Sequence, residues 1–265
     1  MINNIKEYKS KGYKGFEIKN GDFSSVWNAA LYAELYPDYE ALRIEIAKLI
    51  HDCTRLKNPK VLDSCCGSGF LSKDLYLDGF DIDFADKNPS FGESFLSEID
   101  GAKIIQASWH EYPDIVDYKK EYYDFVMCRG NSFIYSSGGI NQEFKANSEL
   151  ATQRYIDSLS GLYYVMKPGA TLYLDKYKDL EIPFKCKVGF DLKTKKEIVW
   201  YCNRKIDEGY REASIGYADE SVSYFHCCDD LDSDLLFKVA HTVGFKIREI
   251  NLKHEKNFSV YLLQK

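Results

Sequence analysis

The feature that most constrains the fold is an alternation of short apolar strands with helical segments between residues 39 and 176. Apolar residues recur at helical spacing in Tyr39–Leu56 and Ser148–Met166, and shorter helices are expected over Phe70–Asp78 and Pro89–Asp100. Strand-like runs alternate with these segments at residues 60–63, 80–85, 102–107, 123–128 and 171–176. Such strand–helix alternation predicts an α/β domain with a parallel, doubly wound sheet.

The pattern changes after residue 180. Short strand-like runs separated by turn residues lie at 185–190, 197–205, 210–217 and 222–227, and they predict a small antiparallel β cap inserted at residues 181–228. A helix is expected over 231–243. The runs 245–252 and 257–263 then predict a terminal hairpin, which places one strand antiparallel in the sheet. We expect a single domain over residues 1–265.

The N-terminal region, residues 1–40, gives weaker signals. Residues 23–36 are aromatic and helical in pattern. We expect residues 1–40 to form a lid region over the site, with Tyr13, Trp27 and Tyr32 as its aromatic side chains.

Charge and hydropathy exclude several classes of partner. The net charge of -6 and the interleaving of acidic and basic residues disfavour a nucleic-acid ligand. The first eleven residues are polar, unlike a signal peptide, and no run of about 18 apolar residues predicts a membrane span. We therefore expect a cytoplasmic protein without a membrane or nucleic-acid partner, and a homo-oligomer stays open.

The cysteines do not follow a metal-binding or disulfide pattern. The chain has eight cysteines but no C-x-x-C pair, so reduced thiols are expected. The one ligand-like cluster is His226-Cys227-Cys228-Asp229, and we expect no metal there.

The loop after the first strand carries the strongest functional signal. Asp63 ends the strand, and Gly67 and Gly69 allow a sharp turn and a close approach of the backbone to a ligand. The following helix offers free N–H groups to an anion, while Asp63 can accept hydrogen bonds from an amine. A dinucleotide site is the main rival, but its G-x-G-x-x-G fingerprint has Ser72 at the third position here. An amine together with a carboxylate is the methionine part of S-adenosylmethionine.

Two further strand ends indicate a nucleoside. Asp86 ends the second strand, 17 residues after Gly69, where a carboxylate can bind both ribose hydroxyls. Ser108 and Trp109 follow the third strand, where an adenine ring would lie.

Together these residues resemble the class I S-adenosylmethionine-dependent methyltransferases, most of all the branch of glycine and sarcosine N-methyltransferases. Residues 61–69 are similar to V-L-D-x-x-C-G-T-G, residues 106–109 to E-A-N-W, and residues 123–133 to F-D-x-V-x-x-x-G-N-S-F. Residues 223–227 are faintly similar to a Tyr-rich strand near that branch's acceptor site. The resemblance covers roughly residues 22–265 and is strong over 60–175.

The resemblance implies a Rossmann-like seven-stranded methyltransferase sheet with S-adenosylmethionine as cofactor. The expected cofactor-binding residues are Asp63, Cys66, Gly67, Gly69, Asp86, Lys87, Ser108, Trp109, Arg129, Gly130 and Tyr32. The expected acceptor-side residues are Asn131, Tyr224, His226 and Tyr177, with Tyr201 beside them.

One departure from the family pattern bears on the acceptor. Members that methylate amino acids carry an Arg after the fifth strand, and Tyr177 stands at that place here. Lys176 and Lys178 offer charge without the bidentate geometry of an Arg, so glycine is disfavoured as acceptor. We expect methyl transfer to a small-molecule amine. O-methylation of a sugar or surface-polysaccharide precursor with His226 as base, a non-catalytic cofactor-binding partner protein, and a nicotinamide oxidoreductase stay as alternatives.

Overall fold

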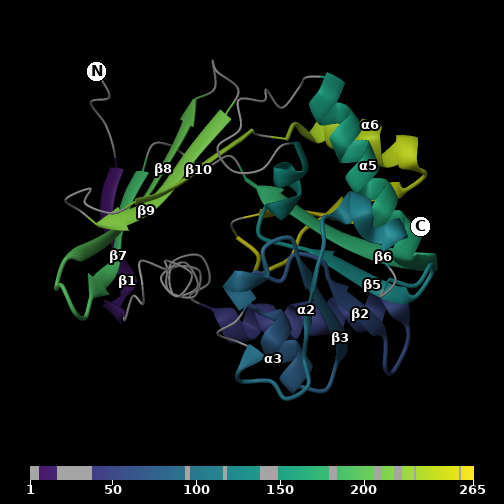
Figure 1. Cartoon of the computed structure of the whole chain (residues 1–265), viewed down its shortest axis with the longest axis horizontal. Coiled ribbons are helices and arrows are strands. Elements are labelled where there is room, and N and C mark those ends of the chain that lie inside the picture. The colour runs from purple at the N-terminus through teal and green to yellow at the C-terminus, as the bar shows by residue number, and fades with distance from the viewer. Residues whose placement is uncertain are drawn as a thin grey trace.

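The computed structural model describes residues 6–16, 38–92, 96–115, 118–137, 149–178, 184–205, 210–217, 223–229, 231–256 and 258–265. Within this part the chain forms a seven-stranded sheet flanked by helices and a five-stranded sheet set to one side (Figure 1). The expected helix at 23–36 lies outside the described residues.

The seven-stranded sheet has the order β11–β12–β6–β5–β2–β3–β4. Its strands are β2 Lys60–Asp63, β3 Asp81–Asp86, β4 Ile104–Gln106, β5 Tyr123–Cys128, β6 Met166–Tyr177, β11 Lys246–Ile250 and β12 Phe258–Gln264. The strands from β4 to β6 are parallel, and β12 is antiparallel to both of its neighbours, β6 and β11. The predicted parallel sheet with its antiparallel terminal hairpin is therefore confirmed.

Helices cover both faces of this sheet (Figure 1). One face carries α2 Tyr39–Thr54 and α3 Ser72–Leu77, and the other carries α5 Glu149–Val165 and α6 Ser233–Val243. Three 3-10 helices, η2 Pro89–Gly92, η3 Trp109–Asp114 and η4 Ser132–Ser137, follow strands β3, β4 and β5. The helix expected over Pro89–Asp100 is described only in part, because residues 93–95 lie outside the described residues.

Side chains alternate between the two faces along each strand. Val61 and Phe125 pack with α2, whereas Leu62 and Val126 pack with α5, and all four side chains are fully buried. This alternation explains why the inner strands read as continuous apolar runs, since a parallel sheet is covered on both faces. Each fully buried aliphatic or Phe side chain stabilises the fold by about 1.5–3 kcal/mol.

The expected boundary between α5 and β6 was wrong. Met166 is the first residue of β6 and not the end of α5, because it pairs with Tyr123. The register between the two strands shifts before Phe125 pairs with Thr171, so Pro168-Gly169 lies inside a strand irregularity rather than before the strand. Gly169 has a φ of +81°, which a glycine adopts without strain.

The second sheet contains the predicted antiparallel cap strands and one strand that was not predicted. Strands β7 Phe184–Asp191, β8 Glu197–Lys205, β9 Tyr210–Tyr217 and β10 Ser223–Asp229 pair antiparallel in chain order. The N-terminal β1 Lys6–Phe16 pairs parallel with β7 at the edge of this sheet. Lysines are common on edge strands, where they prevent pairing with a further strand. They also interrupt the alternation of apolar and polar residues from which a strand is predicted.

Among the described residues, none of the helices combines the length and the hydropathy that crossing a bilayer requires.

Candidate active site

The loop after β2, residues 64–69, is hereafter called the β2 loop. Gly67 and Gly69 have φ values of +48° and +75°, a conformation that glycine adopts at little cost. The Cys66 amide donates to the Ala85 carbonyl at 2.9 Å, which fixes the loop to the end of β3. A Cβ atom placed on Gly67 would meet no atom within 4 Å, so the backbone here borders open space.

Asp86 connects the β2 loop to β3. Its Oδ2 accepts from the Gly67 amide at 2.9 Å and its Oδ1 accepts from the Asn88 amide at 2.8 Å. Burial raises the pKa of Asp86, and the two backbone amides oppose this rise by stabilising the carboxylate. Each carboxylate oxygen keeps a second lone pair for a ligand. The neighbouring Lys87 is exposed.

Asp63 lies at the end of β2 with 6% of its surface exposed. Its Oδ1 accepts from the Cys65 amide at 3.3 Å. Desolvation raises the pKa of Asp63 to about 6, although the nearby Arg129 guanidinium opposes the rise. A carboxylate in this environment gains stability from any cation that binds beside it.

The β2 loop is also held from behind by η3. Ser108 precedes η3 and forms a capping box with Glu111. The indole Nε1 of Trp109 donates to the Ser64 carbonyl at 2.8 Å, and its ring centroid lies 5.8 Å from that of Phe133. Trp109 is therefore half-buried between the β2 loop and η4.

The turn after β5, residues 129–131, is hereafter called the β5 turn. Gly130 and Asn131 have φ values of +76° and +59°. The Asn131 amide donates to Asp175 Oδ1 at 2.7 Å, and the Ser132 hydroxyl donates to the Arg129 carbonyl at 2.6 Å. The Asn131 side chain is 95% buried, since only 5% of its surface is exposed.

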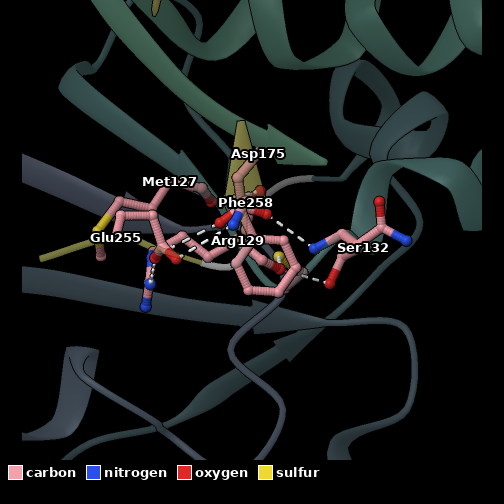
Figure 2. A network of polar contacts seen from close by, with 9 residues as sticks. Met127, Arg129, Ser132, Asp175, Glu255 and Phe258 are labelled. Carbon is pink, nitrogen blue, oxygen red and sulfur yellow. Dashed lines mark hydrogen bonds and ion pairs between the residues drawn. The ribbon is translucent and has the colours of Figure 1, made fainter. Parts of the chain in front are cut away.

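Arg129 lies between two buried carboxylates (Figure 2). Its Nη2 is 3.2 Å from Glu255 Oε2, and its Nε is 3.9 Å from Asp175 Oδ2. Both carboxylate side chains are fully buried, and the Arg129 side chain is 10% exposed. We call Arg129, Asp175 and Glu255 the buried triad. Desolvation raises the pKa of Asp175 to about 7; Arg129 opposes the rise and Glu255 adds to it.

The geometry can be compared with known proteins. No protein-family model matches the chain. Glycine/sarcosine N-methyltransferase from Aphanothece halophytica is 24% identical over 189 residues, which are 71% of this chain and just under two thirds (66%) of that relative. A methyltransferase structure from Clostridium acetobutylicum, described as S-adenosylmethionine-dependent, is 12% identical with a TM-score of 0.64, over 91% of this chain and 97% of that one. The sugar N-methyltransferase KedS8 from Streptoalloteichus is 12% identical with a TM-score of 0.61, over 94% and 95%.

The chain has the class I S-adenosylmethionine-dependent methyltransferase fold.

Within this fold, the residues predicted from the strand ends lie together at one edge of the sheet. Asp63 contacts the β2 loop, Asp86 binds Gly67, Trp109 binds Ser64, and the Cys65 thiol donates to the Arg129 carbonyl at 3.5 Å. Parallel strands place their carboxyl ends at the same edge, which explains this convergence. Cys66 is buried, and burial raises the pKa of its thiol, so it acts as packing in the loop.

The acceptor-side predictions are only partly described. Asn131 lies in the β5 turn, and Tyr201 is half-buried on β8. Tyr224 and His226 stand on β10, whose backbone passes beside η4, but their side chains and that of Tyr177 lie outside the described part. Tyr32 and Trp27 also lie outside it. Tyr13 lies on β1 and donates to Glu197 Oε1 of the cap at 3.1 Å.

Asp175 and Glu255, which lie beside Arg129, were not predicted from the sequence to belong to this region. Asp175 carries a weak signal, because it lies near the end of a predicted parallel strand beside β5. Glu255 lies between β11 and β12 in a segment of unremarkable polar residues, and no local pattern distinguishes it.

Proposed function

We propose that this chain transfers a methyl group from S-adenosylmethionine to a small-molecule amine. The observation that carries the proposal is the junction of β2 and β3, where Asp86 holds the Gly67 amide beside open space. A carboxylate with free lone pairs next to an accessible glycine backbone suits a ligand with vicinal hydroxyls and a charged amino-acid end.

The residues present fit this cofactor. Asp86 would accept hydrogen bonds from the ribose hydroxyls, Asp63 would face the ammonium group, and Ser108 and Trp109 would flank the adenine. When bound, S-adenosylmethionine supplies a methyl group on a sulfonium centre. Methyl transfer needs alignment of the acceptor rather than activation of the leaving group, so the chain's own task is positioning. Asn131, from the β5 turn, would orient the acceptor.

Charge supports an amine as the acceptor. Asp63, Asp175 and Glu255 are three buried carboxylates, and Arg129 is the cation that the structure places among them. Buried carboxylates favour an amine that binds in its ammonium form, which must release a proton to solvent before its neutral nitrogen accepts the methyl group. The two N-methyltransferases to which the chain is similar agree with nitrogen as the methylated atom.

An amino acid is not the expected amine. The Nζ of Lys176 donates to the Leu231 carbonyl at 3.1 Å, and the Nζ of Lys178 donates to the Glu255 carbonyl at 3.3 Å. These two lysines are thus engaged with backbone and provide no bidentate grip for a carboxylate. We propose an amine without a carboxylate, such as an amino sugar.

Calorimetric titration of S-adenosylmethionine and S-adenosylhomocysteine into wild type and Asp86→Ala tests the cofactor. We expect micromolar binding by wild type and affinity weaker by about 100-fold in the variant, because two hydrogen bonds to an ionised group are lost. The control variant is Asp157→Ala, which removes an exposed carboxylate on α5 and should bind as wild type does.

Acceptor class is tested by incubation of wild type with S-adenosylmethionine and a panel of glycine, sarcosine, a nucleotide-linked amino sugar and the matching neutral sugar. Mass spectrometry should show a gain of one methylene on the amino sugar. A gain on the neutral sugar alone would replace the amine with O-methylation. Absence of cofactor binding by folded wild type would overturn the proposal.

A further inference from the structure

The β5 turn holds two consecutive residues in the left-handed region of backbone conformation. Gly130 and Asn131 are consecutive residues with φ values of +76° and +59°. Glycine adopts this region freely, and Asn is among the residues with a side chain that do so most readily, so part of the preference for this turn is local. Asn131 is also buried, so its backbone amide needs an acceptor within the protein. The residue that supplies this acceptor stabilises the turn further.

Asp175 provides that contact. Its Oδ1 accepts from the Asn131 amide at 2.7 Å, from the neighbouring strand β6. Asp175 is fully buried near the end of β6, where it pairs with Val260 of β12, so its position is fixed more firmly than that of a loop residue. The Ser132 hydroxyl adds a second bond within the turn by donating to the Arg129 carbonyl.

Arg129 stabilises the Asp175 carboxylate in the interior, against desolvation and the nearby Glu255. The Arg129 guanidinium lies beside both acids, and its Cζ is 5.8 Å and 5.7 Å from the ring centroids of Phe70 and Tyr173. The triad therefore connects the β5 turn to Phe70, the first residue after the β2 loop, and to the segment before β12. The titratable groups that interact with Asp175 in this region are Arg129, Glu255, Tyr173 and Cys128, and Asp63 interacts in turn with Arg129.

We propose that Asp175 is a positioning residue, whose carboxylate holds the β5 turn in its left-handed conformation and thereby aims Asn131 at the methyl acceptor. The first half of this proposal concerns the chain alone. The second half rests on the proposed methyltransferase function. Asp175 touches neither reactant in this assignment and acts through Asn131.

Hydrogen exchange of the β5 turn tests the first half without any ligand. In Asp175→Ala, peptides that cover residues 129–133 should exchange about 10- to 100-fold faster than in wild type, because the Asn131 amide loses its acceptor. Asp175→Asn keeps an oxygen at that place and should restore most of the protection. Exchange in β2 and β3 should be the same in all three proteins, which separates a local effect from general unfolding.

Kinetics with the methylated member of the acceptor panel test the second half. Asp175→Ala should lower kcat by about 10- to 100-fold, while the Kd for S-adenosylmethionine, measured calorimetrically, stays within about twofold of wild type. Asp175→Asn should recover part of kcat. In wild type, kcat should change as the pH passes through about 7, where the Asp175 carboxyl loses its proton, and this change should be absent in Asp175→Asn. Asp157→Ala serves as the surface control.

Three results would overturn the proposal. Unchanged exchange in Asp175→Ala would show that other contacts hold the turn. Faster exchange with wild-type kcat would show that the turn does not position the acceptor. A parallel loss of cofactor affinity and kcat would assign Asp175 a general structural role. Failure of wild type to bind S-adenosylmethionine would remove the proposed function, yet the exchange data would still decide whether Asp175 holds the turn.

Discussion

The β2 loop and the β5 turn lie at the same edge of the sheet, yet they obtain their shapes in different ways. The β2 loop places glycines where φ is positive, at +48° and +75°, and closes on itself through the Gly69 amide and the Cys66 carbonyl at 2.7 Å. The β5 turn places Asn131 at a φ of +59° and depends on Asp175, 44 residues away. Glycines adopt the conformation of the β2 loop at little cost, whereas a distant carboxylate stabilises the conformation of the β5 turn.

The difference also appears in charge. The carboxylates of the β2 loop region, Asp63 and Asp86, accept hydrogen bonds from backbone amides, and open space borders Gly67. The β5 turn is supported by the buried triad, in which Arg129 and Glu255 are 126 residues apart. The β2 loop, which is stabilised by residues close in sequence, thus lies beside the β5 turn, which is stabilised by distant ones. Substitutions in and around the two regions should therefore have different effects on stability and on cofactor binding.

The largest effect is expected from Arg129→Met, which leaves two buried carboxylates without their cation. We expect the free energy of unfolding at pH 8 to fall by about 3–5 kcal/mol in urea titrations. Burial raises the pKa of Asp175 from 3.8 to about 7, so the native state binds the proton more tightly and stability falls as pH rises through this window. The variant lacks the attraction that opposes this shift, so its fall should be steeper and its deficit smaller at low pH.

The matched control for this prediction is Arg43→Met. Arg43 lies on α2 and pairs with Glu40 and Asp78, which are both exposed, so its loss should cost no more than about 1 kcal/mol. Equal losses in the two variants, or equal pH dependence, would show that burial gives Arg129 no special role.

A smaller effect is expected from Gly161→Ala, which tests whether η3, a segment distant in sequence, also shapes the β2 loop. A Cβ atom on Gly161 of α5 would overlap the carbonyl oxygen of Trp109, whose indole holds Ser64. We expect a loss of about 1–3 kcal/mol in thermal or urea unfolding, together with weaker binding of S-adenosylmethionine. Ser160→Ala changes the preceding position of α5, which is exposed, and should lower neither the stability nor the affinity for S-adenosylmethionine. Wild-type cofactor affinity in a destabilised Gly161→Ala would show that η3 does not shape the loop.

The smallest effect on stability is expected from Gly67→Ala and Gly130→Ala. Both positions have positive φ, and each substitution should cost about 1 kcal/mol in unfolding experiments. Calorimetry should separate them, because the space beside Gly67 is open for a ligand whereas a Cβ on Gly130 lies 3.8 Å from the Ser132 hydroxyl. Gly67→Ala should lose cofactor affinity by about tenfold or more, because one close contact is blocked, and Gly130→Ala should lose less. Equal affinities of the two variants for S-adenosylmethionine would contradict the assignment of the β2 loop to cofactor binding.

Sequence patterns were sufficient for the fold because its main signals are local. Strand β5 and the start of β2 were predicted to the residue, since apolar runs bounded by turn residues mark buried parallel strands. The cap strands β8 and β9 were predicted equally well. Strand β1 was not, because its pairing with β7 joins segments about 180 residues apart and its lysines hide the alternation.

The sequence by itself determined the parallel sheet, the glycine loop and the strand-end residues Asp63, Asp86 and Asn131, because each follows from neighbours within a few positions. Only the tertiary structure decided that Arg129 would be held by Asp175 and Glu255, and that Asp175 would accept from the Asn131 amide. These features depend on contacts across 44 to 126 residues, where the energy of a buried charge is set by what surrounds it and not by what precedes it in the chain.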